Sequence, residues 1–164
     1  MSGFAENRSV ATVALVVGNY DEAIAWYVER LGFVLADDVD LGGGKRWVTV
    51  TPANGQGARL LLAEASGEMQ ASRIGDQTGG RVFLFLETDD FARDHQAMLG
   101  RGVEFREAPR HEAYGTVAVF ADLYGNLGPD RAETARLIGP FGIVREQAET
   151  PVAFSRPSSY VAGS

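Results

Sequence analysis

The chain has 164 residues, of which 45% are hydrophobic, and it carries a formal net charge of -7 at pH 7 with no cysteine. This length and composition predict a single globular domain rather than a disordered chain. The negative charge argues against a nucleic-acid partner, and the lack of cysteine excludes disulfides and thiolate metal sites.

The sequence shows neither a membrane span nor an export signal. The longest apolar stretch without a charge, Val10–Tyr20, is far too short to cross a bilayer. The first six residues lack the basic and apolar regions of a secretory signal. We therefore expect a soluble cytoplasmic protein with no membrane partner.

The first 65 residues follow a strand-helix-strand-strand-strand order. Gly18 ends a buried strand, and Asp21 is the predicted N-cap of a helix that stops at Gly32. Apolar, β-branched or alternating runs separated by turn signals predict the remaining strands. In this first module, which we assign to residues 10–65, the predicted strands are 10–17, 33–36, 46–51 and 58–63.

The same order recurs about 70 residues further along the chain, which indicates a duplicated unit. A strand over 81–87 precedes a helix capped by Asp89-Asp90, and strands follow at 103–105 and 116–120. We assign a second module to residues 81–127 and a polar linker to residues 66–80. The predicted fold class is α+β, with two βαβββ modules in one domain over residues 1–164.

The second module departs from the first at its end. Residues 129–138, which begin with Pro129, have the pattern of a short helix where a fourth strand is expected. Short apolar runs at 141–144 and 152–154 are alternative replacements for that strand. We predict that the last strand is altered and that residues 128–164 form an irregular C-terminal extension.

Three stretches together resemble the vicinal-oxygen-chelate superfamily of glyoxalase I, bleomycin-resistance proteins, fosfomycin-resistance proteins and extradiol dioxygenases. They are Val13–Tyr27 followed by Leu31-Gly32-Phe33, then Phe85–Phe91, and finally Phe120–Asn126. The resemblance covers roughly residues 10–127. It implies a cupped, mostly antiparallel β-sheet that holds a small-molecule ligand between the two modules, and it implies a homodimer.

The resemblance also indicates where a metal would be held, because its ligands come from the first and last strand of each module. The ligand positions fall on Thr12, Glu64, Phe83 and Pro129, so only Glu64 is a metal-binding residue type. The two histidines of the chain, His95 and His111, fall elsewhere. A divalent metal held by displaced ligands remains an alternative, with Glu64, His111 and Glu112 as candidates, joined by Glu87.

Strand alternation and the family geometry together predict the ligand-binding wall. Thr12, Ala14 and Val16 share one face, and Phe83 and Phe85 share another. We expect these faces to point into the cup, joined by Leu60, Leu62 and Glu64, with Arg46 or Trp47 projecting inward according to register. Phe83 and Phe85 could instead fill the core, and Glu64 could be exposed at the strand end. The predicted ligand-binding residues are Thr12, Arg46, Trp47, Leu62, Glu64, Phe83, Phe85 and Tyr114.

Three functions are consistent with these residues. The first is binding of a small apolar or aromatic molecule in a cup with a degenerate metal site. The second is a metal-dependent lyase, isomerase or extradiol-type dioxygenase with displaced ligands, in which Glu64 is the candidate catalytic acid or base. The third is a non-catalytic assembly module without a ligand.

Overall fold

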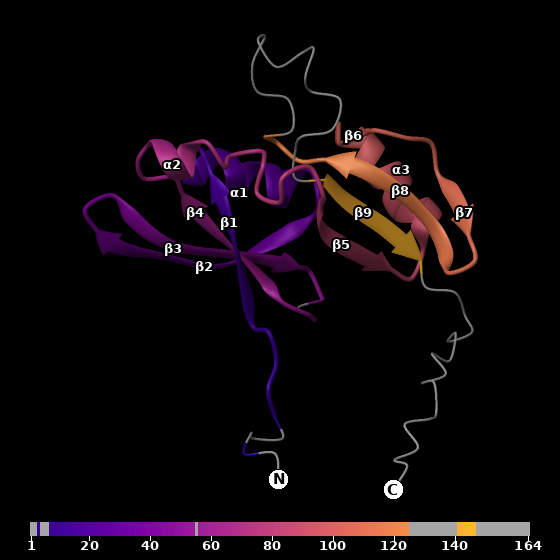
Figure 1. Cartoon of the computed structure of the whole chain (residues 1–164). Helices are drawn as coiled ribbons and strands as arrows, with labels where there is room; N and C mark the ends of the chain where they lie inside the picture. Colours follow the sequence, from indigo (N-terminus) through magenta and orange to yellow (C-terminus); the bar gives the residue numbers. More distant parts are fainter. Residues whose placement is uncertain (1–2, 4–6, 55, 125–140, 147–164) are drawn as a thin grey trace, which may run out of the picture.

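The computed structural model describes residues 3, 7–54, 56–124 and 141–146, which form an α+β fold with two curled, mostly antiparallel sheets (Figure 1). The first module contains β1 (Thr12–Val17), α1 (Tyr20–Glu29), β2 (Phe33–Gly42), β3 (Lys45–Pro52) and β4 (Arg59–Glu64). Its strand order is β1-β4-β3-β2, with β1 parallel to β4 and the other pairs antiparallel. The predicted βαβββ order is therefore confirmed.

The second module repeats this arrangement. It follows α2 (Glu68–Ala71) and contains β5 (Val82–Thr88), α3 (Phe91–Gly100), β6 (Glu104–Phe105), β7 (Arg110–Glu112), β8 (Gly115–Ala121) and β9 (Phe141–Glu146). Its sheet has the order β5-β9-β8-β6, with β7 paired to β8. The strand β9 is parallel to β5 and antiparallel to β8, as β4 is to β1 and β3.

The last strand of the second module thus lies within the stretch that the sequence assigned to a C-terminal extension. It includes the apolar run at 141–144, one of the two predicted replacements. Ala121 of β8 pairs with Phe141 of β9, so the chain returns to the sheet beside the point where it left. The helix predicted over 129–138 and the run at 152–154 lie outside the described residues.

The start of α1 corrects one prediction. Its N-cap is Asn19, whose side-chain Oδ1 accepts a hydrogen bond from the Glu22 backbone N–H at 3.0 Å. Asp21, the predicted cap, lies in the first turn with Glu22, where negative charge favours the positive end of the helix dipole. Gly32 ends the segment as predicted, in a left-handed conformation with a φ of 70°.

The helix α1 contributes to two hydrophobic cores and so joins the modules. Its buried Tyr27 packs with Leu15 and Leu62 in the core of the first sheet. Trp26, on the same helix, contacts both this core and the second-module core around Phe120. Figure 1 shows the two sheets side by side, with α1 at the first and α3 at the second. In the part of the chain that the structure describes, no helix is long and apolar enough to span a membrane.

A buried polar contact reinforces the joint between the modules. The Tyr27 hydroxyl of α1 donates to Asp122 Oδ2 at 3.4 Å, and the Tyr124 backbone N–H donates to Asp122 Oδ1 at 3.0 Å. The Tyr124 hydroxyl in turn donates to the Asn19 carbonyl oxygen at 3.4 Å. Burial, together with the Asp122 carboxylate, raises the pKa of Tyr27 well above its ordinary value.

This contact predicts a loss of stability in alkali. In the unfolded chain tyrosines ionise near pH 10, whereas in the folded state Tyr27 stays neutral at that pH. The stability that the neutral Tyr27 contributes is therefore fully present below about pH 10 and is lost as the pH rises further. Tyr27→Phe should lower the free energy of unfolding at pH 7 by about 1–3 kcal/mol, because Asp122 loses a buried donor. The same variant should lose less stability than the wild type between roughly pH 10 and 11.

Urea unfolding at pH 7, 10 and 11 measures both effects. The matched control is Tyr114→Phe, which removes the hydroxyl of an exposed tyrosine and should match the wild type at each pH. If Tyr27→Phe and the wild type lose stability equally steeply above pH 10, the raised pKa of Tyr27 is not the cause of the alkaline loss.

Candidate ligand-binding site on the first sheet

The pairing of β1 with β4 fixes which side chains share each face of the first sheet. Thr12 lies beside Arg59, and Leu15 beside Leu62. The face that carries Leu15 and Leu62 packs against α1. We call the opposite face the open face; its residues are Thr12, Ala14 and Val16 of β1, Arg59, Leu61 and Ala63 of β4, Trp47, Thr49 and Thr51 of β3, and Asp37 and Val39 of β2.

This register corrects the predicted orientation of three residues, because Leu60, Leu62 and Glu64 all lie on the α1 side of β4. Leu62 is fully buried in the core on the α1 side, and Glu64 lies on the same side because it pairs with Val17. Alternation alone allowed either set of β4 residues to face the same way as Thr12. The parallel register selects Arg59 and Leu61 as neighbours of Thr12 and Ala14, so Glu64 is not beside Thr12.

The side chain of Glu64 has a partner at the beginning of α1. Its Oε2 accepts a hydrogen bond from the Tyr20 backbone N–H at 3.0 Å, which satisfies one of the unpaired donors at the helix start. The carboxylate also lies at the positive end of the helix dipole. This contact accounts for an acid at the end of an apolar strand without a catalytic role.

Arg46 is held on the α1 side of β3. Its guanidinium bonds to Asp38 Oδ2 at 2.6 Å and to Asp21 Oδ1 at 2.8 Å, and it lies 5.1 Å from the centroid of the Tyr20 ring. The hydrogen bonds to Asp38 and Asp21 raise the pKa of Arg46, and the bond to Arg46 lowers the pKa of Asp38. Trp47, the next residue, is therefore the one that projects from the open face.

A cavity of about 720 Å³ opens where β3 and β4 separate. The two strands pair over Val48–Val50 and Leu60–Leu62, and the cavity lies beyond this ladder, next to the β2–β3 turn. We call it the hairpin pocket; its lining includes Tyr20, Leu41, Arg46, Trp47, Leu62 and Glu64. Four of the predicted ligand-binding residues, Arg46, Trp47, Leu62 and Glu64, thus meet at one cavity.

The predicted residues of the second module are not part of this cavity's lining. Phe83 is half-buried and packs against the first-module core, whereas Phe85 is exposed on β5. Tyr114 is exposed in the turn between β7 and β8. The sequence therefore identified two separate groups of residues, one on each sheet.

The histidines and acids considered as metal ligands have other contacts. His111 lies on β7, where its Nδ1 is 3.0 Å from Thr116 Oγ1, and Glu112 pairs with Arg110. His95 packs between Phe91 and Phe105, with ring centroids 5.3 and 4.3 Å away. Among the described residues, no three His, Asp or Glu side chains form a group that could hold a metal ion.

Sequence reasoning missed a polar group on the open face. Asp37 Oδ2 accepts hydrogen bonds from Thr49 Oγ1 at 2.5 Å and from Arg59 Nη1 at 3.0 Å. The sequence predicts a strand only over 33–36, whereas β2 continues to Gly42. In the added part Asp37 pairs with Arg59 on one face and Asp38 pairs with Arg46 on the other.

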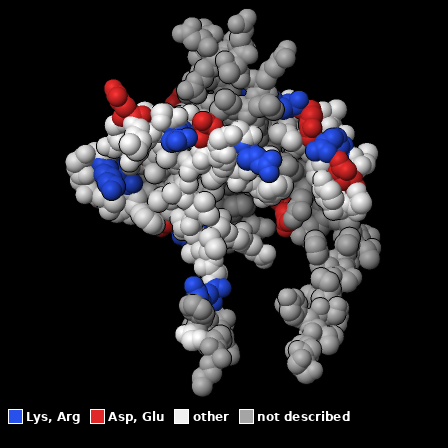
Figure 2. All heavy atoms as spheres, viewed as in Figure 1, with Lys and Arg blue, Asp and Glu red and all other residues white. Residues whose placement is uncertain are grey.

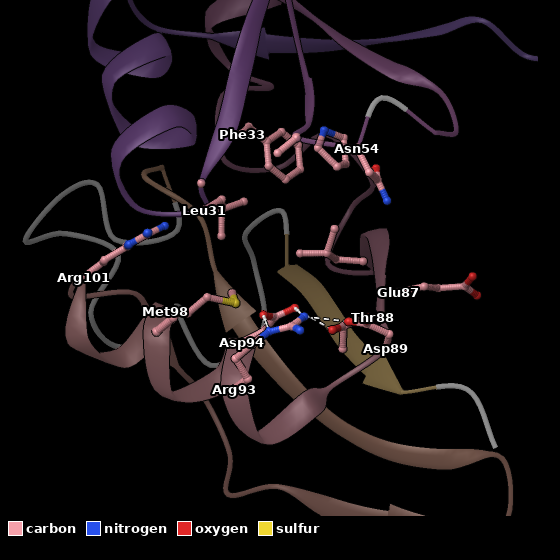
Figure 3. A pocket seen from close by; sticks show the side chains of 15 residues that line it. Leu31, Phe33, Asn54, Glu87, Thr88, Asp89, Arg93, Asp94, Met98 and Arg101 are labelled. Carbon is pink, nitrogen blue, oxygen red and sulfur yellow. Dashed lines mark hydrogen bonds and ion pairs between the residues drawn. The ribbon is translucent and has the colours of Figure 1, made fainter. Parts of the chain in front are cut away.

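A second cavity, of about 780 Å³, lies between the modules (Figure 3). Leu31 and Phe33 line it from the first module and Met98 from α3, as the view shows. Its polar wall is a network in which Arg93 bonds to Asp94 and Asp89 at 2.8 and 2.6 Å. None of the predicted ligand-binding residues lines this cavity, and three of its charged residues, Arg93, Asp94 and Asp89, are engaged with one another.

Comparison with known proteins identifies the family. The family model described as the Glyoxalase/Bleomycin resistance protein/Dioxygenase superfamily matches residues 9–127 of the chain. The chain belongs to this superfamily. The resemblance seen in the sequence is thereby confirmed, and the matched range ends before β9.

The chain is also similar to a protein of known sequence and to two solved structures over most of its length. An uncharacterized protein of Shewanella frigidimarina (strain NCIMB 400) is 53% identical over 121 residues, which cover 73% of this chain and 90% of that protein. The structure of UcmS2 is 24% identical with a TM-score of 0.66, covering 86% of this chain and 98% of that one. TnmS3, an antibiotic binding protein from Streptomyces sp. CB03234, is 25% identical with a TM-score of 0.63, covering 88% and 100%.

The contact of Glu64 with α1 predicts a role in stability. Glu64→Ala should lower the free energy of unfolding by about 1 kcal/mol, because Tyr20 loses its acceptor at the helix start. Glu64→Gln keeps an acceptor oxygen and should lose only about 0.3–1 kcal/mol, the contribution of charge to the helix dipole. Chemical denaturation of the variants at low salt measures the difference.

The control is Glu29→Ala, which removes an exposed acid from the opposite end of the same helix. There the dipole disfavours negative charge, so this variant should be neutral or slightly more stable. Equal stability of Glu64→Ala and the wild type would show that the contact does not stabilise α1.

Proposed function

We propose that the protein binds a small apolar or aromatic molecule on the open face of its first sheet, next to the hairpin pocket. The observation that carries this proposal is the exposed pair formed by Trp47 and Val39. They are direct cross-strand neighbours on β3 and β2, and they are 42% and 52% exposed. Small-molecule sites are cavities lined mostly by apolar and aromatic side chains, and Trp47 contributes such a side chain to the hairpin pocket.

The polar residues of the face support a role in binding. Asp37 and Arg59 are partly exposed beside apolar neighbours such as Leu61, whereas Thr49 is buried and donates to Asp37, so the face combines apolar side chains with two charged groups that can orient a ligand. The structural similarity to TnmS3, an antibiotic binding protein, is consistent with this function. By contrast, Glu64 is engaged by α1, and no observation on the described residues favours a lyase or dioxygenase.

We also propose that the protein is a cytoplasmic homodimer in which a second copy covers part of the exposed apolar surface. Val34 and Leu35 are exposed at the beginning of β2, which forms one edge of the first sheet. Burial of such side chains against another copy would stabilise a dimer by about 25 cal/mol per Å² of apolar surface removed from water, before the cost of association. Acidic and basic side chains are interspersed over the described part of the view in Figure 2.

Trp47 provides a direct test of ligand binding. The chain has two tryptophans, so Trp26→Phe leaves Trp47 as the sole tryptophan reporter. Bleomycin and 2-acetylnaphthalene serve as aromatic probes, titrated by calorimetry and followed by Trp47 fluorescence. Trp47→Ala should weaken binding roughly tenfold or more, because stacking and apolar burial of a tryptophan contribute at least about 1.4 kcal/mol.

Trp26→Phe is the matched control, since it changes the tryptophan that lies between the modules and should bind the probes as the wild type does. The proposal fails if neither probe binds the wild type, or if Trp47→Ala binds them with unchanged affinity.

The dimer is tested by sedimentation equilibrium. Val34→Asp places a charge on β2 and should shift the protein towards the monomer, because burial of an unpaired carboxylate disfavours association. Val10→Asp makes the same change at a residue that precedes β1, and it should leave the association unchanged. A wild-type protein that sediments as a monomer at all concentrations would contradict the proposed dimer.

A further inference from the structure

The ion pair on the open face joins three strands. Arg59 is on β4, yet its Nη1 reaches Asp37 on β2 at 3.0 Å, although β3 lies between these strands in the sheet order. The Thr49 hydroxyl on β3 donates to the same carboxylate oxygen, Asp37 Oδ2, at 2.5 Å. The Arg59 side chain therefore extends across β3 and lies over the sheet.

Both charged groups retain hydrogen-bonding capacity that faces solvent. The Arg59 side chain is 50% exposed and the Asp37 side chain is 36% exposed. Within the described residues, the side-chain hydrogen bonds of the pair use only Arg59 Nη1 and Asp37 Oδ2. The remaining guanidinium N–H groups and Asp37 Oδ1 thus offer donors beside an acceptor.

The pair is next to the proposed apolar binding surface. Trp47 and Leu61 both line the hairpin pocket. On the open face Trp47 is two residues from Thr49 along β3, and Leu61 is two residues from Arg59 along β4. Two residues of a strand span about 6.6 Å, roughly the length of one fused aromatic ring system. A ligand stacked on Trp47 can therefore place a polar substituent at the ion pair.

We propose that Asp37 and Arg59 select an aromatic ligand that carries a neutral group with an acceptor and a donor side by side, such as a carboxamide or a hydroxy-ketone. This inference rests on the proposed binding function. A carboxylate substituent would bind Arg59 but repel Asp37, and an ammonium group would do the reverse. A carboxamide satisfies both, because its carbonyl accepts from Arg59 while its N–H donates to Asp37.

Three naphthalenes that differ in one substituent test this selection. Calorimetry measures the affinity of the wild type for 2-naphthamide, 2-naphthoate and 2-naphthylmethylammonium. We expect the amide to bind about tenfold more tightly than either ion, since a single misplaced charge near a half-exposed ion pair costs on the order of 1.4 kcal/mol.

Reciprocal variants separate recognition from a structural role. Arg59→Met leaves Asp37 as an unpaired anion and should shift the preference to the ammonium compound. Asp37→Asn leaves Arg59 as an unpaired cation and should shift it to naphthoate. Thermal melts confirm that each variant is folded. Arg93→Met, which breaks an ion pair on α3 away from the open face, is the control and should keep the preference for the amide.

If the Asp37–Arg59 pair only stabilises the sheet, Arg59→Met and Asp37→Asn will lower the melting temperature without reversing the order of affinities. The selection is disproved if the three compounds bind the wild type equally, or if the variants keep the wild-type order. In either case, binding that still depends on Trp47 would leave the proposed function intact. If none of the three binds the wild type, the selection is also disproved, and the proposed function is then decided by the titrations of bleomycin and 2-acetylnaphthalene.

Discussion

The parallel pairing of β1 with β4 is the constraint on which the first module depends. It places Leu15 beside Leu62 under α1 and Thr12 beside Arg59 on the open face. A shift of one residue would expose Leu62 and turn Arg59 towards the core, where an arginine without a partner is strongly unfavourable. The second module uses the same device, with β9 parallel to β5.

This register places the contacts that stabilise the first module on one face of the sheet and the proposed binding surface on the other. The charged residues on the α1 side are engaged with the helix: Arg46 with Asp21, and Glu64 with the Tyr20 backbone. The open face carries the exposed Trp47 and the half-exposed pair of Asp37 and Arg59. Substitutions of the exposed residues on the open face therefore alter few contacts with α1.

The order of elements could be predicted because it depends on local patterns. Apolar runs, caps and glycine stops recur in both modules, and the family resemblance rests on the same local stretches. The face of β4 could not be predicted, because an apolar strand alternates equally well in either register. The full length of β2 was hidden by Asp37 and Asp38, whose partners Arg59 and Arg46 are distant in sequence. The apolar run at 141–144 indicated β9 as one possible last strand, but its pairing with β5 and β8 is a long-range feature that the run itself does not encode.

The stretch between the modules has a consequence for self-association. Gln77 Oε1 accepts from the Val16 backbone N–H at 3.1 Å, and Gln77 Nε2 donates to the Ala14 carbonyl at 3.2 Å. These are the bonds that an additional strand would make with β1, which is the outermost strand on that side of its sheet. A single amide side chain thus occupies an edge that would otherwise template strand addition and aggregation. The predicted linker therefore also protects the fold against uncontrolled edge-to-edge assembly.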